Sequence, residues 1–189
     1  MNIKNIAEII GGQIISRVEA KKETDVVLRT AKILVPKAIT NGSIDHDNLA
    51  EINIKTELDE KKLTKSGDIV LKLSQPYDAA YISKEDKNLL VTSFCLILRG
   101  ISDEVNALYL LSVLNSSIYK EQALSLTSGA TVPILTKGNV EKVDIDIVEL
   151  EKQNEIVKFS EEISEKEKLF SKIIRLEKMK LENLLRGEY

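Results

Sequence analysis

The sequence has few of the residues that most chemical sites require. Among its 189 residues there is one cysteine, one histidine and no tryptophan, and aromatic residues make up only 4%. The single cysteine, Cys95, excludes an internal disulfide, and its place in the apolar run 92–98 indicates a small buried residue. With so few aromatic residues, the core must be built mainly from Ile, Leu and Val. The hydrophobic fraction of 43% is sufficient for such a core and too high for a disordered chain.

Long apolar runs are also missing. No stretch approaches the roughly 18 apolar residues of a transmembrane helix, and residues 1–5 do not resemble a signal peptide. We therefore expect a protein of the reducing cytoplasm that does not enter a membrane. Its length fits one domain of ordinary size plus an appendage.

The patterns of the common catalytic and metal sites are absent. His46 lies in an Asp-His-Asp segment after a turn, which is typical of a solvated loop and not of a metal site. Since Cys95 lies in an apolar run, it does not suit a nucleophile paired with that histidine. The order Thr-Lys-Gly at 136–138 is wrong for a phosphate-binding loop. We expect no catalysis, no cofactor and no metal.

One loop invites a sharper interpretation. Residues 74–77, Ser-Gln-Pro-Tyr, follow an expected strand and are similar to the loop with which amino-methyltransferases hold a flipped base. However, Gln75 stands where that loop has its first proline, and no glycine-rich turn for an adenosyl cofactor is present. A loop that places polar side chains in a DNA groove is the better account. Gln75 would then pair with adenine, and Tyr77 would pack on sugar or base.

Basic residues are not in excess. There are 27 lysines and arginines against 30 aspartates and glutamates, so the formal net charge is −3. Residues 1–150 contain 18 basic and 21 acidic residues, and residues 151–189 contain nine of each. A protein that holds DNA unaided usually has a basic face. Either the basic residues lie together on one face, or a partner supplies many of the phosphate contacts.

Up to about residue 150 the chain mixes short apolar runs with turn residues. These patterns favour an α/β (mixed α+β) domain with a curved mixed sheet and flanking helices. We expect a short helix over residues 3–10 and a longer one from Ser102, as N-cap, to about Leu126. Strands are expected at 26–29, 32–35, 51–55, 69–73, 89–98 (one strand or a pair) and 143–147.

The remainder, residues 151–189, is expected to form one long C-terminal coiled-coil helix that ends near Arg186. A helix of this length, near 50 Å, is too long for one domain to bury its apolar stripe. We therefore expect a partner helix, against the alternative of a helix folded back on its own domain. The expected dimer-interface residues recur at helical steps: Ile156, Phe159, Ile163, Phe170, Ile173, Leu181 and Leu184.

Four ordered segments resemble the recognition domain of type I restriction-modification specificity subunits. They are Val-Pro-Lys-Ala-Ile-Thr-Asn-Gly-Ser-Ile at 35–44, Ser-Gly-Asp-Ile-Val-Leu at 66–71, Asn-Ala-Leu-Tyr-Leu through Leu-Asn-Ser at 106–116, and Ser-Gly-Ala-Thr-Val-Pro-Ile-Leu at 128–135 joined to the Gln153 segment at 150–156. Each motif is weak alone, but the ordered set covers nearly the whole chain. The resemblance implies recognition of double-stranded DNA. It also implies methyltransferase (modification) subunits as partners, with the restriction subunit as a further candidate.

The sequence departs from that family in two respects. The prolines usual before the family's glutamine are missing from residues 145–150. Members commonly have two recognition domains and two helices, whereas this chain has room for one of each and resembles a half-subunit. A homodimer with antiparallel helices would restore both and read a bipartite, palindromic site.

The DNA contacts are expected where strands end, because loops on a rigid scaffold commonly hold recognition residues. The candidates are Lys37, Asn41, Lys72, Ser74, Gln75, Tyr77, Arg99, Ser128, Thr131 and Lys137. The lysines and Arg99 would hold phosphates, while the glutamine, asparagine and threonine would read base edges. The alternative function is a coiled-coil assembly protein whose globular head binds protein and not DNA, which the acidic balance favours.

Overall fold

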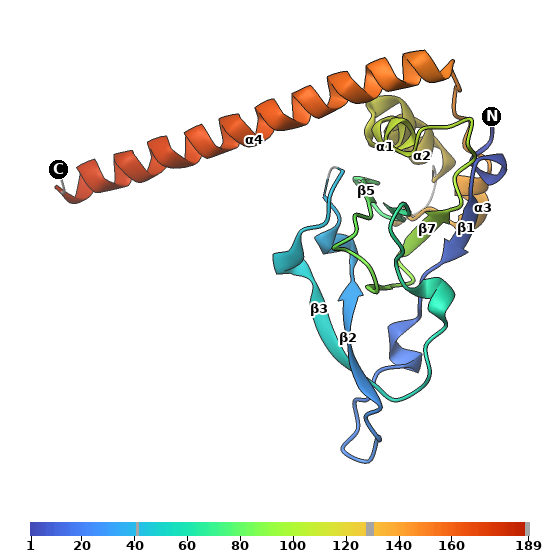
Figure 1. Ribbon diagram of the computed structural model, residues 1–189. Coiled ribbons are helices and arrows are strands. Elements are labelled where there is room, and N and C mark those ends of the chain that lie inside the picture. Colours follow the sequence, from blue (N-terminus) through green and yellow to red (C-terminus); the bar gives the residue numbers. More distant parts are fainter. Residues whose placement is uncertain (41, 128–130, 188–189) are drawn as a thin grey trace.

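The computed structural model describes residues 1–40, 42–127 and 131–187. It consists of a domain with two β-sheets and short helices, from which one long helix extends as an arm (Figure 1). The strands are β1 (Glu8–Gly11), β2 (Arg29–Leu34), β3 (Ala50–Ile54), β4 (Ile69–Lys72), β5 (Ala79–Tyr81), β6 (Leu90–Val91) and β7 (Cys95–Arg99). The α-helices are α1 (Ala107–Asn115), α2 (Ser117–Leu126), α3 (Lys137–Glu141) and α4 (Leu150–Arg186). Single 3-10 turns lie at Ile3–Asn5, Ile15–Arg17, Pro36–Ala38, His46–Asn48 and Glu60–Lys62.

The larger sheet is four-stranded, antiparallel throughout and covered on both faces. Its strand order is β1-β7-β4-β5. Along β4, Ile69 and Leu71 belong to the core that the helices cover, whereas Val70 belongs to the core on the opposite face. Because both faces are buried, the central strands β4 and β7 are nearly continuous apolar runs without alternation. The expected strand at 69–73 is therefore confirmed.

The smaller sheet has the order β3-β2-β6, with an antiparallel and a parallel pair. The expected fold class is confirmed, but the strands form two sheets in place of one. The apolar run 89–98 is divided between them, since β6 joins one sheet and β7 the other. The chain also crosses between the sheets at Gly12, where a Cβ atom would lie 2.1 Å from the carbonyl oxygen of Thr92.

Several expected elements differ in the structure. Residues 3–10 form a 3-10 turn and β1, because pairing of Ile9 and its neighbours with β7 satisfies their backbone in a sheet. Residues 26–28 precede β2 and are exposed. Among the described residues the 143–147 segment forms no strand and has only a bridge between Asp144 and Asn2.

The expected helix from Ser102 to Leu126 begins later and is broken once. Its N-cap is Asn106, whose side chain accepts from the Leu108 amide at 2.9 Å, while Ser102 lies in the preceding turn. Ser116 ends α1, and its hydroxyl accepts from the Tyr119 amide to begin α2. A side-chain cap at that position starts a new helix in place of continuing the old one.

The long helix is confirmed, with bounds within one residue of those expected. Gln153 and Val157 near its start are buried in the domain, while residues 158–186, here called the helical arm, project past α1 and away from the sheets (Figure 1). Gly187 ends the helix with φ of +73°, a left-handed conformation that glycine adopts readily.

Candidate nucleic-acid interface

Three segments that are distant in sequence meet at one end of the larger sheet. The loop at 74–77 leaves the carboxyl end of β4, and the turn at 92–94 enters β7 beside it, since the Leu73 amide donates to the Phe94 carbonyl at 3.0 Å. The segment 131–134 joins them through an antiparallel bridge between Ser74 and Ile134. We call these three segments the loop cluster.

A buried tyrosine fixes the loop cluster from below. Tyr77 is only 1% exposed, and its hydroxyl donates to the Pro133 carbonyl at 3.1 Å and lies 3.2 Å from Thr127 Oγ1. Its ring therefore packs in the core and is closed to DNA, so the expected stacking on sugar or base is wrong. The same contacts leave Gln75 exposed beside residues 131–133.

Next to the loop cluster is a cluster of three charged side chains. Lys72 and Lys120 contact the two carboxylate oxygens of Asp78 at 3.1 and 2.8 Å. Burial raises the pKa of Asp78, but the hydrogen bonds from the two lysines outweigh it and hold the pKa below its ordinary value. Lys72 is nearly buried and serves this ion pair, so it is not available as the expected phosphate contact. Lys120, which the sequence analysis missed, is more exposed and leaves the cluster with one net positive charge.

Arg99 lies elsewhere and has a different role. It is the last residue of β7, whereas Lys72 pairs with Cys95 at the other end of that strand. Its guanidinium makes two hydrogen bonds with the nearly buried Asp68 at 2.9 and 2.7 Å, and it also donates to the Lys61 and Leu63 carbonyls. The hydrogen bond with Asp68 raises the pKa of Arg99 further. Because four of its five N–H donors are occupied and it is paired with Asp68, Arg99 serves the fold and is not available as the expected phosphate contact.

The remaining expected contacts divide by position. Thr131 is exposed within the loop cluster, and Ser74 is half-buried there. Lys37 is exposed just after β2, which runs parallel to β6 and ends on the side of the turn at 92–94. Lys137 is exposed at the start of α3, 3.8 Å from Glu141. Asn41 and Ser128 lie outside the described residues.

Sequence analysis also missed the apolar part of this surface. Phe94, Val132 and Ile134, all in the loop cluster, are 60%, 63% and 43% exposed. Phe94 was counted within a buried run, because a single exposed position at a turn does not interrupt a local apolar pattern. The loop cluster therefore combines polar tips with large apolar side chains.

Two polar residues of the motifs at 106–116 and 150–156, Asn115 and Gln153, join elements of the structure together. Asn115 accepts from the Ala79 amide at 2.9 Å and donates to its carbonyl at 3.0 Å, which joins α1 to β5. Gln153, fully buried, accepts from the Asn106 amide and donates to the Glu104 and Val148 carbonyls. These contacts hold the first turn of α4 on the domain. The helix therefore has a fixed start although residues 145–150 lack the family's usual prolines.

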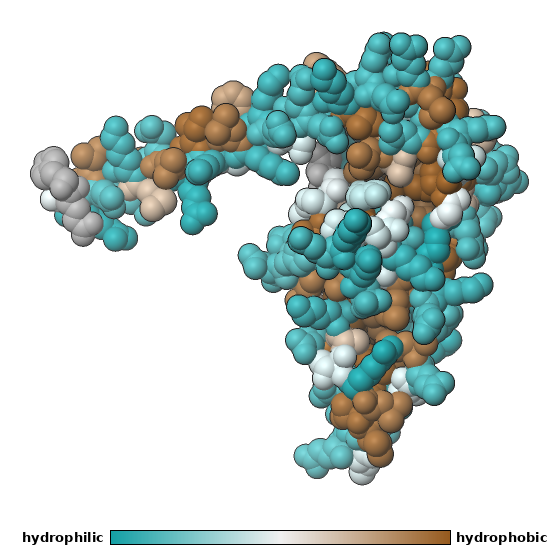
Figure 2. All heavy atoms as spheres, in the orientation of Figure 1, coloured by the Kyte–Doolittle hydropathy of each residue, from teal (hydrophilic) through white to brown (hydrophobic). Residues whose placement is uncertain are grey.

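Along the helical arm, the expected dimer residues are exposed. Phe159, Ile163, Phe170, Ile173, Leu181 and Leu184 are each at least 42% exposed, while Ile156 packs partly on the domain core. Figure 2 shows brown apolar groups along the arm among teal polar ones. Because the arm projects from the domain, its apolar residues have no cover within the described chain.

Two further classes of site have no support within residues 1–40, 42–127 and 131–187. No group of three or more His, Cys, Asp or Glu side chains there is arranged to hold a metal ion. No helix in this part of the chain combines the length and apolar character needed to cross a bilayer.

These features define a domain that displays loops at one end and from which a long helix extends with its apolar residues exposed. The family model described as the type I restriction modification DNA specificity domain matches residues 1–181. The chain belongs to this family.

Solved structures agree on the fold. A chain from a study of complex assembly and conformational transition of the type I R-M system is similar, with a TM-score of 0.72, 16% identity and coverage of 99% of this chain and 47% of that chain. The HsdS subunit from Thermoanaerobacter tengcongensis is similar, with a TM-score of 0.68, 17% identity and coverage of 98% and 46%. The chain thus spans about half the length of these solved chains. No curated protein sequence matches it.

Proposed function

We propose that this chain recognises a DNA sequence for a type I restriction-modification methyltransferase complex and performs no catalysis itself. The observation that carries the proposal is the loop cluster. In this cluster the exposed Gln75 and Thr131 lie on loops that the buried Tyr77 holds in place. Polar side chains on loops fixed by a buried scaffold are suited to reading base edges, because little order must be gained on binding. Membership of the DNA specificity family supports the same function.

The side chains have different roles in this proposal. Ser74, Gln75 and Thr131 read base edges, and a glutamine amide can pair with adenine through two hydrogen bonds. Lys37, Lys120 and Lys137, which lie around the loop cluster or on the same side of the sheets, hold phosphates. The apolar Phe94 and Val132 contact sugars or thymine methyl groups.

In this proposal, partner subunits supply part of the contacts with the DNA phosphates. With a formal net charge of −3, the chain has no overall excess of positive charge with which to neutralise many phosphates alone. We infer that methyltransferase (modification) subunits supply the remaining contacts, with the restriction subunit as a further candidate partner. DNA affinity is therefore expected to be strong only in the complex.

Residues 1–150 form the recognition domain in this proposal, and residues 151–189 form the dimerisation helix and spacer. The exposed apolar residues of the helical arm favour a two-fold dimer with antiparallel helices. Such a homodimer presents two copies of the loop cluster and reads a bipartite, palindromic site.

The test is selection from a random pool of double-stranded DNA with the cognate modification subunit present. The expected result is one enriched sequence with two inverted half-sites, together with an affinity that falls steeply as salt rises. If no sequence is enriched when the partner is present, the proposal is contradicted.

A matched pair of variants locates the contact. Gln75→Ala is expected to weaken binding to the selected site by about tenfold or more, since a bidentate base contact contributes about 1–3 kcal/mol. Gln122→Ala, on α2 beside Asp144, is the control and is expected to leave affinity unchanged. Equal affinities for the two variants would remove Gln75 from the interface.

The second candidate is an assembly protein whose domain binds another protein. The exposed Phe94, Val132 and Ile134 favour it, since grouped apolar side chains suit protein contacts. It predicts no DNA binding at low salt, with or without the modification subunit. The salt titration therefore separates the two functions.

A further inference from the structure

The face of α4 that packs on its own domain continues along the helical arm without cover. Gln153 and Val157 on this face are buried. At heptad steps from them along the helix stand Ile174, Leu181 and Leu185, which are 56%, 56% and 79% exposed. The positions between them on this face are mostly polar, so the uncovered apolar surface lies mainly in the last turns of the helix, at Leu181 and Leu185.

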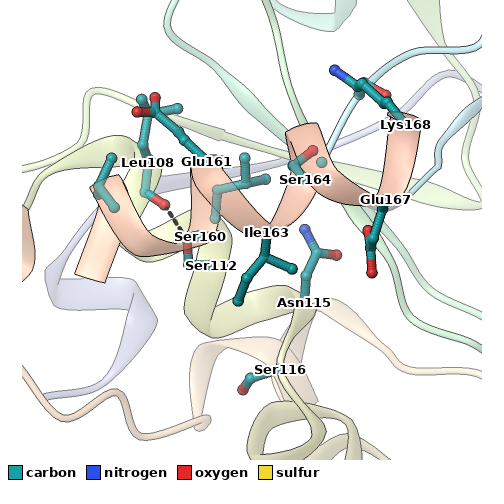
Figure 3. Close-up of a pocket in the computed structure, with 14 residues that line it drawn as sticks. Leu108, Ser112, Asn115, Ser116, Ser160, Glu161, Ile163, Ser164, Glu167 and Lys168 are labelled. Carbon is teal, nitrogen blue, oxygen red and sulfur yellow. Dashed lines mark hydrogen bonds between the residues drawn. The ribbon is translucent and has the colours of Figure 1, made fainter. Parts of the chain in front are cut away.

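Beside the junction of domain and helix is an open groove of about 320 Å³. Its walls are α1, the start of the helical arm and the turn at residues 42–43. Leu108 and Leu111 of α1 and Ile163 of α4 form an apolar strip in a lining that is otherwise mostly serines and charged residues. Figure 3 shows Ile163 pointing from α4 towards Asn115 on α1. The short side chains of Ser160 and Ser164 leave room for residues from outside.

The charged residues in the apolar stripe of the arm select one helix pairing. In heptads, position a is taken by Ile163, Phe170, Glu177 and Leu184, and position d by Phe159, Lys166, Ile173 and Lys180. In an antiparallel pair, a residues face d residues. With the two-fold axis between Ser171 and Lys172, Lys166 faces Glu177 of the second copy, and this ion pair forms twice.

The same register also pairs the apolar residues. Phe170 faces Ile173 of the second copy, and Phe159 faces Leu184 of the second copy. Lys180 meets Ile163 through its aliphatic stem, which leaves the ammonium group in solvent. Moving the axis by half a heptad in either direction places both Lys166 and Glu177 against apolar residues. A parallel pair would instead place lysine against lysine and glutamate against glutamate.

This register uses the full length of the arm. Arg186, the last helical residue, comes opposite Val157, where α4 enters its own domain. The two points of attachment are then about 45 Å apart along the pair, at 1.5 Å per residue. Since two-fold symmetry keeps equivalent sides together, both domains lie on the same side of the helix pair. The uncovered Leu181 and Leu185 of each copy face that side as well.

We propose that the groove between α1 and α4 receives the last turns of α4 from a second copy of the chain. Leu181 and Leu185 of the second copy pack there against Leu108 and Leu111. The inference rests on the two-fold dimer of the proposed function and adds a domain-to-helix contact that fixes the angle between domain and arm. A rigid angle would hold the two loop clusters at one spacing on DNA.

The register is tested by exchanging charges in the full chain and measuring the dimer dissociation constant by analytical ultracentrifugation. Lys166→Glu and Glu177→Lys each place like charges together twice and are expected to raise the constant by about tenfold or more. The double variant is expected to return it to within about threefold of the original. Lys172→Glu, away from the a and d positions, is the control. Failure of the double variant to recover would overturn the antiparallel register.

The docking contact is tested by crosslinking between two different variants. A Leu185→Cys chain and a Ser112→Cys chain, mixed and treated with a short bis-maleimide, are expected to give a covalent dimer, since Ser112 lines the groove. The native Cys95 does not interfere, because burial raises the pKa of its thiol to about 12. Met179→Cys, off the docking face and half-exposed, replaces Leu185→Cys in the control and is expected not to crosslink with Ser112→Cys.

Light scattering on the same mixtures separates the possible failures. A dimer that gives no crosslink, or one that crosslinks equally through Met179→Cys, overturns the docking contact and leaves the proposed dimer standing. Absence of any dimer overturns both.

Discussion

The domain and the helical arm contain similar apolar residues but differ in whether those residues are buried. In the domain, Ile, Leu and Val are buried on both faces of a sheet, and nearly every buried polar side chain among the described residues has a partner. On the arm, residues of the same kinds are exposed along more than 40 Å of helix, estimated at 1.5 Å per residue. The difference shows that apolar content does not indicate where a core lies. What decides is whether another element of the same chain can reach the surface.

The largest expected effect comes from disrupting the arm. The double substitution Phe170→Asp and Ile173→Asp places charges at the centre of the proposed helix pair and is expected to raise the dimer dissociation constant by over about a hundredfold. Because both side chains project from the domain, its melting temperature should not change. Light scattering and circular dichroism measure the two quantities.

Met179→Asp on the same arm is the control and should remain dimeric. A double variant that also remains dimeric would place the dimer interface outside the arm. That result would contradict the view that the arm's exposed apolar residues are covered by a second copy of the helix.

A buried and an exposed ion pair are expected to differ in how much they stabilise the fold. Arg99→Ala in the domain leaves Asp68 nearly buried and without its guanidinium partner, so the free energy of unfolding is expected to fall by about 3 kcal/mol. Lys152→Ala on α4 removes a pair that is exposed at both ends, and the expected change is under about 0.5 kcal/mol. Urea denaturation measures both, and similar losses would contradict the difference in burial.

The joint between the two regions should have an intermediate effect. Gln153→Leu leaves the Asn106 amide and the Glu104 and Val148 carbonyls without their side-chain partner, which is expected to cost about 2 kcal/mol of unfolding free energy. The neighbouring Asn154→Leu loses one exposed hydrogen bond and should cost under about 0.5 kcal/mol. Equal stability of the two variants would mean that the joint does not depend on the buried amide.

The smallest expected effect is a dependence on acid within the domain. The two lysines hold the pKa of Asp78 below its ordinary value of 3.8, despite burial. A depressed pKa in the folded state stabilises the fold above the unfolded value, and this contribution is lost as the pH falls from about 4 through the folded pKa. Asp78→Asn should therefore lose less stability than the wild type between about pH 4 and pH 2, by urea denaturation. Parallel losses would show that another carboxylate is responsible.

Much of the fold could be predicted from local pattern. The strand at 69–73 and the long helix were identified because burial on two faces and heptad spacing each leave a continuous trace in sequence. Residues 3–10 were misassigned, since apolar residues at helical steps also fit a 3-10 turn followed by an edge strand. The start at Ser102 was misplaced because several polar residues there could cap a helix, and only packing selects Asn106.

The candidate site was less predictable. Gln75 and Thr131 were found as polar residues next to strand ends, and they remain proposals for DNA contact. Tyr77, Lys72 and Arg99 fit the same rule, but the fold directs their side chains inward or into ion pairs. Lys120 and Phe94 were missed, because their place near the loop cluster depends on contacts between segments distant in sequence.

The sequence by itself determined the change to a helical pattern at about residue 150, the aliphatic core and a helix too long for its own domain, since these follow from composition and periodicity. It also contained the ordered motifs of the DNA specificity family. Only the tertiary structure decided which polar residues face solvent and which join elements together. It also revealed the groove between α1 and α4. The physical reason is that burial and ion pairing are properties of segments brought together in space, and a local pattern does not contain them.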